Sequence, residues 1–276
     1  MDLQEQPSHN HQEVINRFTA TCQTDERVVA ATLYGSNVGG AADAYSDLDL
    51  ALITTDQAYE GFLAGREAFV RLLGEPLFME DFDSPETLFL MFSDGTDVEL
   101  SFGRESKFNQ VQRGPYRVLV DKKNILAGAV FPEDEPTQAG QIEKLRRLVY
   151  WFWHDLAHFI TAMGRGQLWW AYGQLEVLRL MCVNLARLRH DFSDPYVGEE
   201  AYFKLEKVLP VEQLASLQAT YCPMERDAML QAGLALLRFY QELAPLLAQA
   251  HGITYPDALE RVMVDRLEKL SDKRLS

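Results

Sequence analysis

Hydrophobic residues in the first half of the chain alternate between helical spacing and short continuous runs. Residues 10–24 place Val14, Ile15, Phe18 and Cys22 on one face, which predicts an amphipathic helix. Short apolar runs bounded by polar or glycine residues predict buried strands; these runs are Val28–Tyr34, Leu48–Thr54, Leu77–Phe82, Thr87–Phe92 and Asp97–Phe102. Residues 57–73 again show helical spacing, which predicts a second helix. Asp94-Gly95 predicts a hairpin turn, and Tyr116–Val120 predicts an edge strand.

After Phe131 the pattern changes to long amphipathic helices. The segment PEDEPTQAG is charged and carries two prolines, which is typical of a domain boundary. Helical spacing then covers residues 141–163, 167–190, 199–219 (broken at Pro210), 225–250 and 256–271. The pattern predicts an α+β protein, in which a mixed β-sheet domain of residues 1–131 precedes a helical bundle of residues 138–276.

Composition narrows the class of protein. The net charge is −15, and so acidic a surface repels the phosphate backbone, so we expect no nucleic-acid partner. It attracts metal ions and polyamine-like ligands, although a role in solubility alone explains it equally well. No stretch reaches the roughly 20 apolar residues of a membrane span, and the polar N-terminus has no secretion signal. Three scattered cysteines fit neither a disulfide framework nor a zinc knuckle. We therefore expect a cytoplasmic protein without membrane partners.

One stretch combines residues that favour phosphate and metal binding. Gly35-Ser36 ends the first predicted strand, and Asp47 and Asp49 follow after ten intervening residues. A Gly-Ser pair at a strand end lets backbone N–H groups and a hydroxyl face a phosphate. Residues two apart on a strand share a face, and two adjacent carboxylates repel each other unless a cation lies between them. Mg²⁺ fits, because it binds through one or two carboxylates together with substrate phosphates.

A third carboxylate on a neighbouring strand would complete a two-metal site. The predicted strand Asp97–Phe102 offers Asp97 and Glu99, again two apart on one face. An Asp-x-Asp pair alone is common on exposed strands that have no function. The full pattern is more specific, because inward-pointing Leu48 and Leu50 leave both aspartates on an otherwise buried sheet.

The pattern of Gly-Ser, ten residues, Asp-Leu-Asp-Leu and a later acidic strand resembles the signature of the DNA polymerase β-like nucleotidyltransferase superfamily. DERVVAATLYGS, AYSDLDL and DGTDVELSF resemble the catalytic domain of antibiotic nucleotidyltransferases, above all the lincosamide enzyme and, more loosely, the streptomycin-type aminoglycoside adenylyltransferases. GRGQLWWAYGQLEVLRL, KLEKVLP, LQATY and ALERVMVDRLEKL are similar to their helical C-terminal domain. The resemblance runs from about Asp25 to Leu270, and outside the motif it is a similarity of layout.

The resemblance implies a catalytic domain followed by a helical domain that binds substrate or forms a homodimer. Two Mg²⁺ ions would be bound by Asp47, Asp49 and a third acid, with Gly35 and Ser36 holding the phosphates of ATP or another NTP. An acceptor hydroxyl then attacks the α-phosphorus in line, and pyrophosphate leaves.

Three residues are candidates for the third acid. Glu99 matches the acidic position of the streptomycin-type enzymes, whereas Asp97 and Glu105 match positions of the lincosamide enzyme. We favour Glu99, as a metal ligand, as the general base that deprotonates the hydroxyl, or as both in turn.

Residues of the helical half have two interpretations each. Arg165 either faces the triphosphate, as the resemblance implies, or simply favours a helix C-terminus that Gly166 closes. His154 and His158 are four apart and offer two metal ligands, but no third stands at zinc-like spacing, so we do not expect zinc. We expect Trp151 and Phe152 to pack in the core. An acceptor pocket is expected to be lined by Trp153, His154 or Asp155. Packing or a dimer contact is expected for Trp169, Trp170 and Tyr172.

The leading functional hypothesis is Mg-dependent transfer of AMP from ATP to a small-molecule hydroxyl, such as one on an aminoglycoside or lincosamide antibiotic. The acidic catalytic half suits both, because both carry amines. The alternatives are nucleotidylation of a protein or an RNA end, and a catalytically silent helical interaction protein. The acceptor pocket is expected between the two domains.

Overall fold

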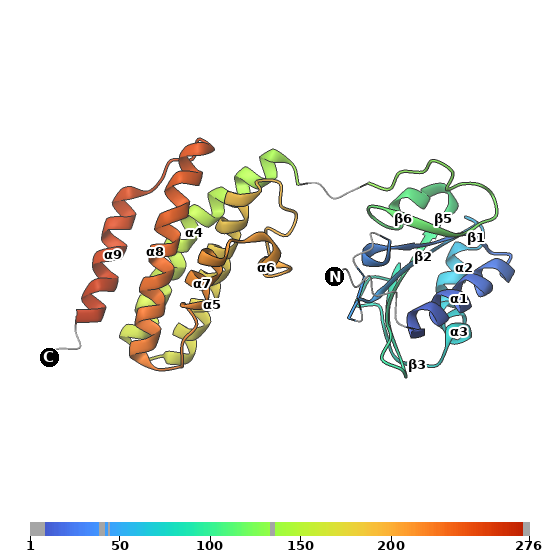
Figure 1. Ribbon diagram of the computed structural model, residues 1–276, viewed down its shortest axis with the longest axis horizontal. Helices are drawn as coiled ribbons and strands as arrows, with labels where there is room; N and C mark the ends of the chain where they lie inside the picture. Colours follow the sequence, from blue (N-terminus) through green and yellow to red (C-terminus); the bar gives the residue numbers. More distant parts are fainter. Residues whose placement is uncertain (1–8, 39–41, 44, 133–135, 273–276) are drawn as a thin grey trace. The chain divides into compact units, whose positions relative to one another are not determined.

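The chain forms two compact units that divide between residues 134 and 135 (Figure 1). The computed structural model describes residues 9–38, 42–43, 45–132 and 136–272. The first unit combines a β-sheet with helices, and the second is helical in its described part. The predicted α+β class, with a mixed sheet followed by helices, is confirmed.

A six-stranded sheet organises the first unit, in the order β3-β4-β5-β2-β1-β6. β2 and β5 pair in parallel, and the other neighbouring pairs are antiparallel. This register sets residues of β2 directly beside residues of β5 although about fifty positions separate them in sequence. The strands are β1 (Val28–Tyr34), β2 (Leu48–Thr54), β3 (Pro76–Glu80), β4 (Thr87–Phe92), β5 (Asp97–Arg104) and β6 (Tyr116–Asp121).

Helices α1 (His9–Thr24), α2 (Tyr59–Ala64) and α3 (Arg66–Leu73) lie against one face of the sheet (Figure 1). Side chains alternate between the two faces along β2. Leu48, Leu50 and Leu52 therefore all point to the helix-covered face, into a core shared with α1 and α3. On the opposite face, Ile53 packs with Leu126 and Phe131 near the carboxyl end of β2. Asp49 therefore projects from the face that the helices do not cover.

The second unit packs its long helices side by side (Figure 1). Phe152 of α4 stacks on Tyr240 of α8 with ring centroids 3.8 Å apart, and the Tyr240 hydroxyl donates to the Val149 carbonyl over 2.6 Å. None of the described helices combines the length and apolarity that a membrane crossing requires. The helices are α4 (Gln138–Gly164), α5 (Leu168–His190), α6 (Leu205–Val208), α7 (Val211–Gln218), α8 (Arg226–Ala250) and α9 (Asp257–Asp272).

Some boundaries differ from the sequence prediction for local backbone reasons. The helix expected over residues 57–73 is broken at Gly65, whose φ of −109° and ψ of 13° are not helical and whose helix propensity is poor. The strand expected to reach Phe82 ends at Glu80, because Phe82 and Asp83 adopt positive φ. The helix expected from residue 199 begins only at Leu205, after a series of turns.

Candidate active site

Acidic residues meet where β2 and β5 begin. Asp49 and Glu99 are register partners on these two parallel strands, and Asp47 immediately precedes β2. Their neighbours Leu48 and Leu50 are fully buried, whereas Asp49 and Glu99 are partly exposed and Asp47 is exposed. The structure thus brings together the carboxylates that the motif predicts on one face of the sheet.

The turn after β1 is shaped around Asp49. Gly35 has a φ of +66°, and a Cβ added there would lie 1.8 Å from Asp49 Oδ2. A side chain at position 35 would therefore overlap with the carboxylate, and the positive φ also disfavours non-glycine residues. Glycine at position 35 is therefore needed to let the chain pass directly beside the acid.

Ser36 and Asn37 offer polar atoms beside the same turn. Ser36 Oγ is buried and has no hydrogen-bond partner among the described residues. Asn37 Nδ2 donates to the carbonyl of Asp47 over 2.7 Å, and its buried Oδ1 has no partner in the described part of the chain. A buried hydroxyl without a partner is costly, and a phosphate oxygen is a suitable acceptor for it.

Mutual repulsion and burial perturb the carboxylates. Burial, followed by the charges of Asp47 and Glu99, raises the pKa of Asp49 to about 7. Burial and the charge of Asp47 also raise the pKa of Glu99, and a long 3.4 Å hydrogen bond from the Tyr34 hydroxyl opposes this. Among the described residues, no cationic side chain offsets the repulsion at these two acids. The site is therefore suited to a divalent cation.

The carboxylates are nevertheless spread apart to some degree. In the described part of the chain, one group of three potential metal-ligating side chains has its ligand atoms within 4.8 Å of one another. That group lies on α4 and does not include these three acids. Asp47, Asp49 and Glu99 thus need side-chain rotation to ligate one ion together.

The other candidates for the third acid lie differently. Asp97 is the exposed first residue of β5, on the same face as Glu99 and two residues from it. Glu105 follows the far end of β5, about 20 Å along the strand from Glu99, and pairs with Lys123 over 2.7 Å. The assignment of Glu105 to the catalytic group is wrong, because six residues of extended chain carry it to the opposite end of the sheet.

Sequence reasoning missed three residues of this site. Asn37 holds the backbone of Asp47, and the Tyr34 hydroxyl lies 3.4 Å from Glu99 Oε1 and 3.2 Å from Ser101 Oγ. Their positions follow from strand register, since Tyr34 pairs with Asp49 and Ser101 lies two residues after Glu99 on β5. A polar residue directly after Gly-Ser was a usable signal for Asn37.

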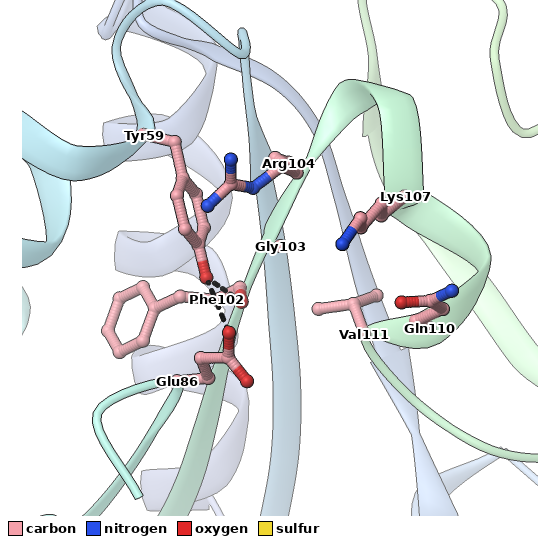
Figure 2. Close-up of a pocket in the computed structure, with 8 residues that line it drawn as sticks. All are labelled: Tyr59, Glu86, Phe102, Gly103, Arg104, Lys107, Gln110 and Val111. Atoms are coloured by element: carbon pink, nitrogen blue, oxygen red, sulfur yellow. Dashed lines mark hydrogen bonds between the residues drawn. The ribbon is translucent and has the colours of Figure 1, made fainter.

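A separate small cavity lies at the opposite end of β5 (Figure 2). It holds about 110 Å³ and is lined in part by Glu86, Arg104 and Lys107. The Tyr59 hydroxyl donates to Glu86 over 3.3 Å, and the Arg104 guanidinium lies over the Tyr59 ring at 4.0 Å. None of the predicted site residues lines this cavity.

In the helical unit, some predictions about α4 are wrong. Trp153 is 1% exposed and packs against Phe152 and Tyr240, so it belongs to the core and cannot line an acceptor pocket. Trp151, expected in the core, is 59% exposed. The rotation of α4 about its axis explains both wrong predictions. With Phe152 and Trp153 packed against Tyr240 of α8, Trp151 points to solvent.

The remaining helical residues are placed as follows. His154 is exposed beside the largely buried Asp155, and their role toward an acceptor stays a prediction. Arg165 ends α4 and Gly166 follows with a φ of +69°, which is the helix-closing geometry; a role at the triphosphate also stays a prediction. Core packing is wrong for Trp169, Trp170 and Tyr172, which are 82%, 38% and 37% exposed, and a dimer contact through them stays a prediction.

Comparison with known proteins identifies the family. The sequence model described as streptomycin adenylyltransferase matches residues 8–270. No curated protein is similar enough in sequence to match. Among solved structures, an aminoglycoside 6-adenyltransferase from Bacillus subtilis has 14% identity and a TM-score of 0.40, with 98% of each chain covered. The STING-associated CdnE c-di-GMP synthase from Capnocytophaga granulosa has 12% identity and a TM-score of 0.31, covering 96% of this chain and 80% of its own.

The family match tests the resemblance drawn from the motif. It confirms the streptomycin-type likeness, whereas the likeness to the lincosamide enzyme stays a prediction. The match spans both units, including the Gly35 turn and the acids of β2 and β5. The chain therefore belongs to the streptomycin adenylyltransferase family and is a nucleotidyltransferase.

Proposed function

We propose that this chain transfers AMP from ATP, with Mg²⁺, to a hydroxyl of a small cationic acceptor of the aminoglycoside class, and releases pyrophosphate. The observation that carries the proposal is the pairing of Asp49 with Glu99 on parallel strands beside the Gly35 turn. The family's name supplies the reaction class and one acceptor, streptomycin. The net charge of −15 supports a cationic acceptor.

The donor set of the site suits magnesium. Asp47, Asp49 and Glu99 would hold the ion, because Mg²⁺ prefers carboxylate and phosphate oxygens. Burial and repulsion raise the pKa of Asp49 to about 7, and both costs fall when a cation lies between the acids. When bound, Mg²⁺ would supply electrostatic stabilisation of charge on the transferred phosphoryl group.

The turn after β1 would position the nucleotide. The Ser36 hydroxyl would donate to a phosphate oxygen, which gives its buried Oγ the partner it lacks among the described residues. Backbone N–H groups of the same turn would donate to the phosphate as well, as the Gly-Ser pattern predicts. Asn37 would keep Asp47 in place through its bond to the Asp47 carbonyl.

Glu99 would act as the general base. The acceptor hydroxyl oxygen forms a bond to the α-phosphorus, the bond from that phosphorus to the pyrophosphate oxygen breaks, and the hydroxyl proton passes to the Glu99 carboxylate. Burial raises the pKa of Glu99 in the metal-free chain, and the carboxylate would take the proton in turn with its role as a metal ligand. Asp97, at the exposed start of the same strand, is the less favoured candidate.

The test is a transfer assay with each of ATP, GTP, CTP and UTP, labelled at the α-phosphate, and Mg²⁺. Streptomycin, further aminoglycosides and a lincosamide serve as acceptors. We expect labelled acceptor and equimolar pyrophosphate, with ATP preferred, and no product from Asp49→Asn. Absence of labelled small-molecule product with all acceptors would reject the proposal; label on the protein itself or on added RNA would support the alternative functions instead.

A further inference from the structure

Three side chains on α4 gather outside the carboxylate site. His154 Nδ1 lies 3.0 Å from Asp155 Oδ1, and the ring centroids of His154 and His158 are 4.3 Å apart. One ligand atom from each of the three lies within 4.8 Å of the other two. Sequence reasoning discounted this site because it saw no third ligand; Asp155 supplies one.

The helix holds these groups on one surface. Residues four apart on a helix are neighbours, so His154 and His158 project side by side. The same helix buries Phe152, Leu156 and Phe159 completely, which fixes its rotation. The Asp155 side chain is 13% exposed and turns back toward the His154 ring, whereas the His154 side chain is 61% exposed. A ligand could therefore reach the group from solvent.

We propose that His154, Asp155 and His158 bind one divalent transition-metal ion, with zinc the best fit. Two imidazole nitrogens and one carboxylate oxygen are a donor set that suits zinc and is poorly suited to magnesium. With metal–ligand bonds of about 2.0 Å, two ligands of a tetrahedral ion lie about 3.3 Å apart. The 3.0 Å separation of His154 and Asp155 is close to that value.

Closing the site requires a small movement. The ligand atoms of the three side chains are at most 4.8 Å apart. Side-chain rotations that move these atoms roughly 1.5 Å closer together would give the spacing of a tetrahedral ion. The fourth position then remains open to water on the exposed side of His154. This site goes beyond the proposed function, because it lies in the helical unit and needs neither ATP nor an acceptor to form.

Two tryptophans would report binding. The Trp151 ring centroid lies 6.1 Å from that of His154, and the Trp170 centroid lies 5.7 Å from that of His158. A paramagnetic ion such as Co²⁺ at this site should quench their fluorescence.

The experiment titrates untagged, metal-free protein with ZnCl₂ by calorimetry, in buffer that already contains millimolar MgCl₂. A parallel titration with CoCl₂ follows visible absorption and tryptophan fluorescence. We expect one equivalent of Zn²⁺, binding at least about tenfold weaker in Asp155→Asn, and loss of this binding in the double variant His154→Ala, His158→Ala. Circular dichroism checks that each variant is folded.

Two control variants separate this site from others. His190→Ala removes an exposed histidine that contacts Gln213, and Asp49→Asn alters the carboxylate site; both should keep the full Zn²⁺ equivalent. Absence of saturable Zn²⁺ binding, or equal binding by the folded double variant, would overturn the proposal. Because the readout needs no nucleotide, its failure is distinguishable from failure of AMP transfer.

Discussion

Replacing Asp49 by asparagine should stabilise the free protein while it abolishes nucleotidyl transfer. Burial and the charges of Asp47 and Glu99 raise the pKa of Asp49 from 3.8 to about 7. Asparagine has nearly the same shape and carries no charge. The substitution therefore removes the cost of ionising a half-buried carboxyl beside two other acids, and it also removes a ligand that the reaction needs.

The sign and size of the change in free energy of unfolding follow from the difference in the Asp49 pKa between the folded and unfolded chain. Between about pH 4 and 7 the folded chain holds a proton at Asp49 that the unfolded chain has released, so stability falls as pH rises through this window. The shift of about three pKa units corresponds to about 4 kcal/mol as an upper bound. Solvent screening of a partly exposed carboxylate reduces this to about 2 kcal/mol.

Urea denaturation in magnesium-free buffer at pH 5 and pH 8 measures the difference. We expect the gain in free energy of unfolding for Asp49→Asn to be larger at pH 8 than at pH 5, by about 1–2 kcal/mol. Asp97→Asn, at the exposed start of β5, is the matched control and should gain little. A variant no more stable than the original at pH 8, or a gain independent of pH, would refute the reasoning.

Further predictions concern the turn, the base and the helical core. Gly35→Ala should reduce kcat by about 10²-fold, because its Cβ would displace the carboxylate that lies 1.8 Å away; unchanged kcat would contradict the described contact. Glu99→Gln should reduce kcat by about 10²–10⁴-fold, whereas Glu105→Gln should stay near the original rate in the same assay. Arg187 is fully buried and pairs with Asp194 over 2.6 Å, so Arg187→Met should lower the free energy of unfolding by about 3–5 kcal/mol, measured by urea denaturation. A loss below 1 kcal/mol would mean that the buried pair contributes little.

Most strands of the first unit were well predicted because their signals are local. β1, β2 and β4 have the predicted bounds, since each is an apolar run between polar or glycine residues. Gly35, Asp47 and Asp49 could be found from spacing alone. The resemblance already favoured Glu99 over Glu105. Their separation in space follows from the pairing of β2 with β5, which no local pattern encodes.

The orientation of α4 could not be predicted for a different reason. Residues 150–153 are all aromatic, so several helix phases would bury an apolar face. Stacking of Phe152 on Tyr240 selects one phase, which buries Trp153 and exposes Trp151. The contact of Asp155 with His154 was missed because adjacent helix residues normally diverge, and here the carboxylate turns back.

The most direct test of the carboxylate site is a crystal structure with Mn²⁺ in place of Mg²⁺ and an ATP analogue that cannot be cleaved at the α-phosphate. We expect anomalous density for manganese between Asp47, Asp49 and Glu99, with a phosphate oxygen within hydrogen-bond distance of Ser36 Oγ. Nucleotide and metal bound away from these residues, at full occupancy, would contradict the account.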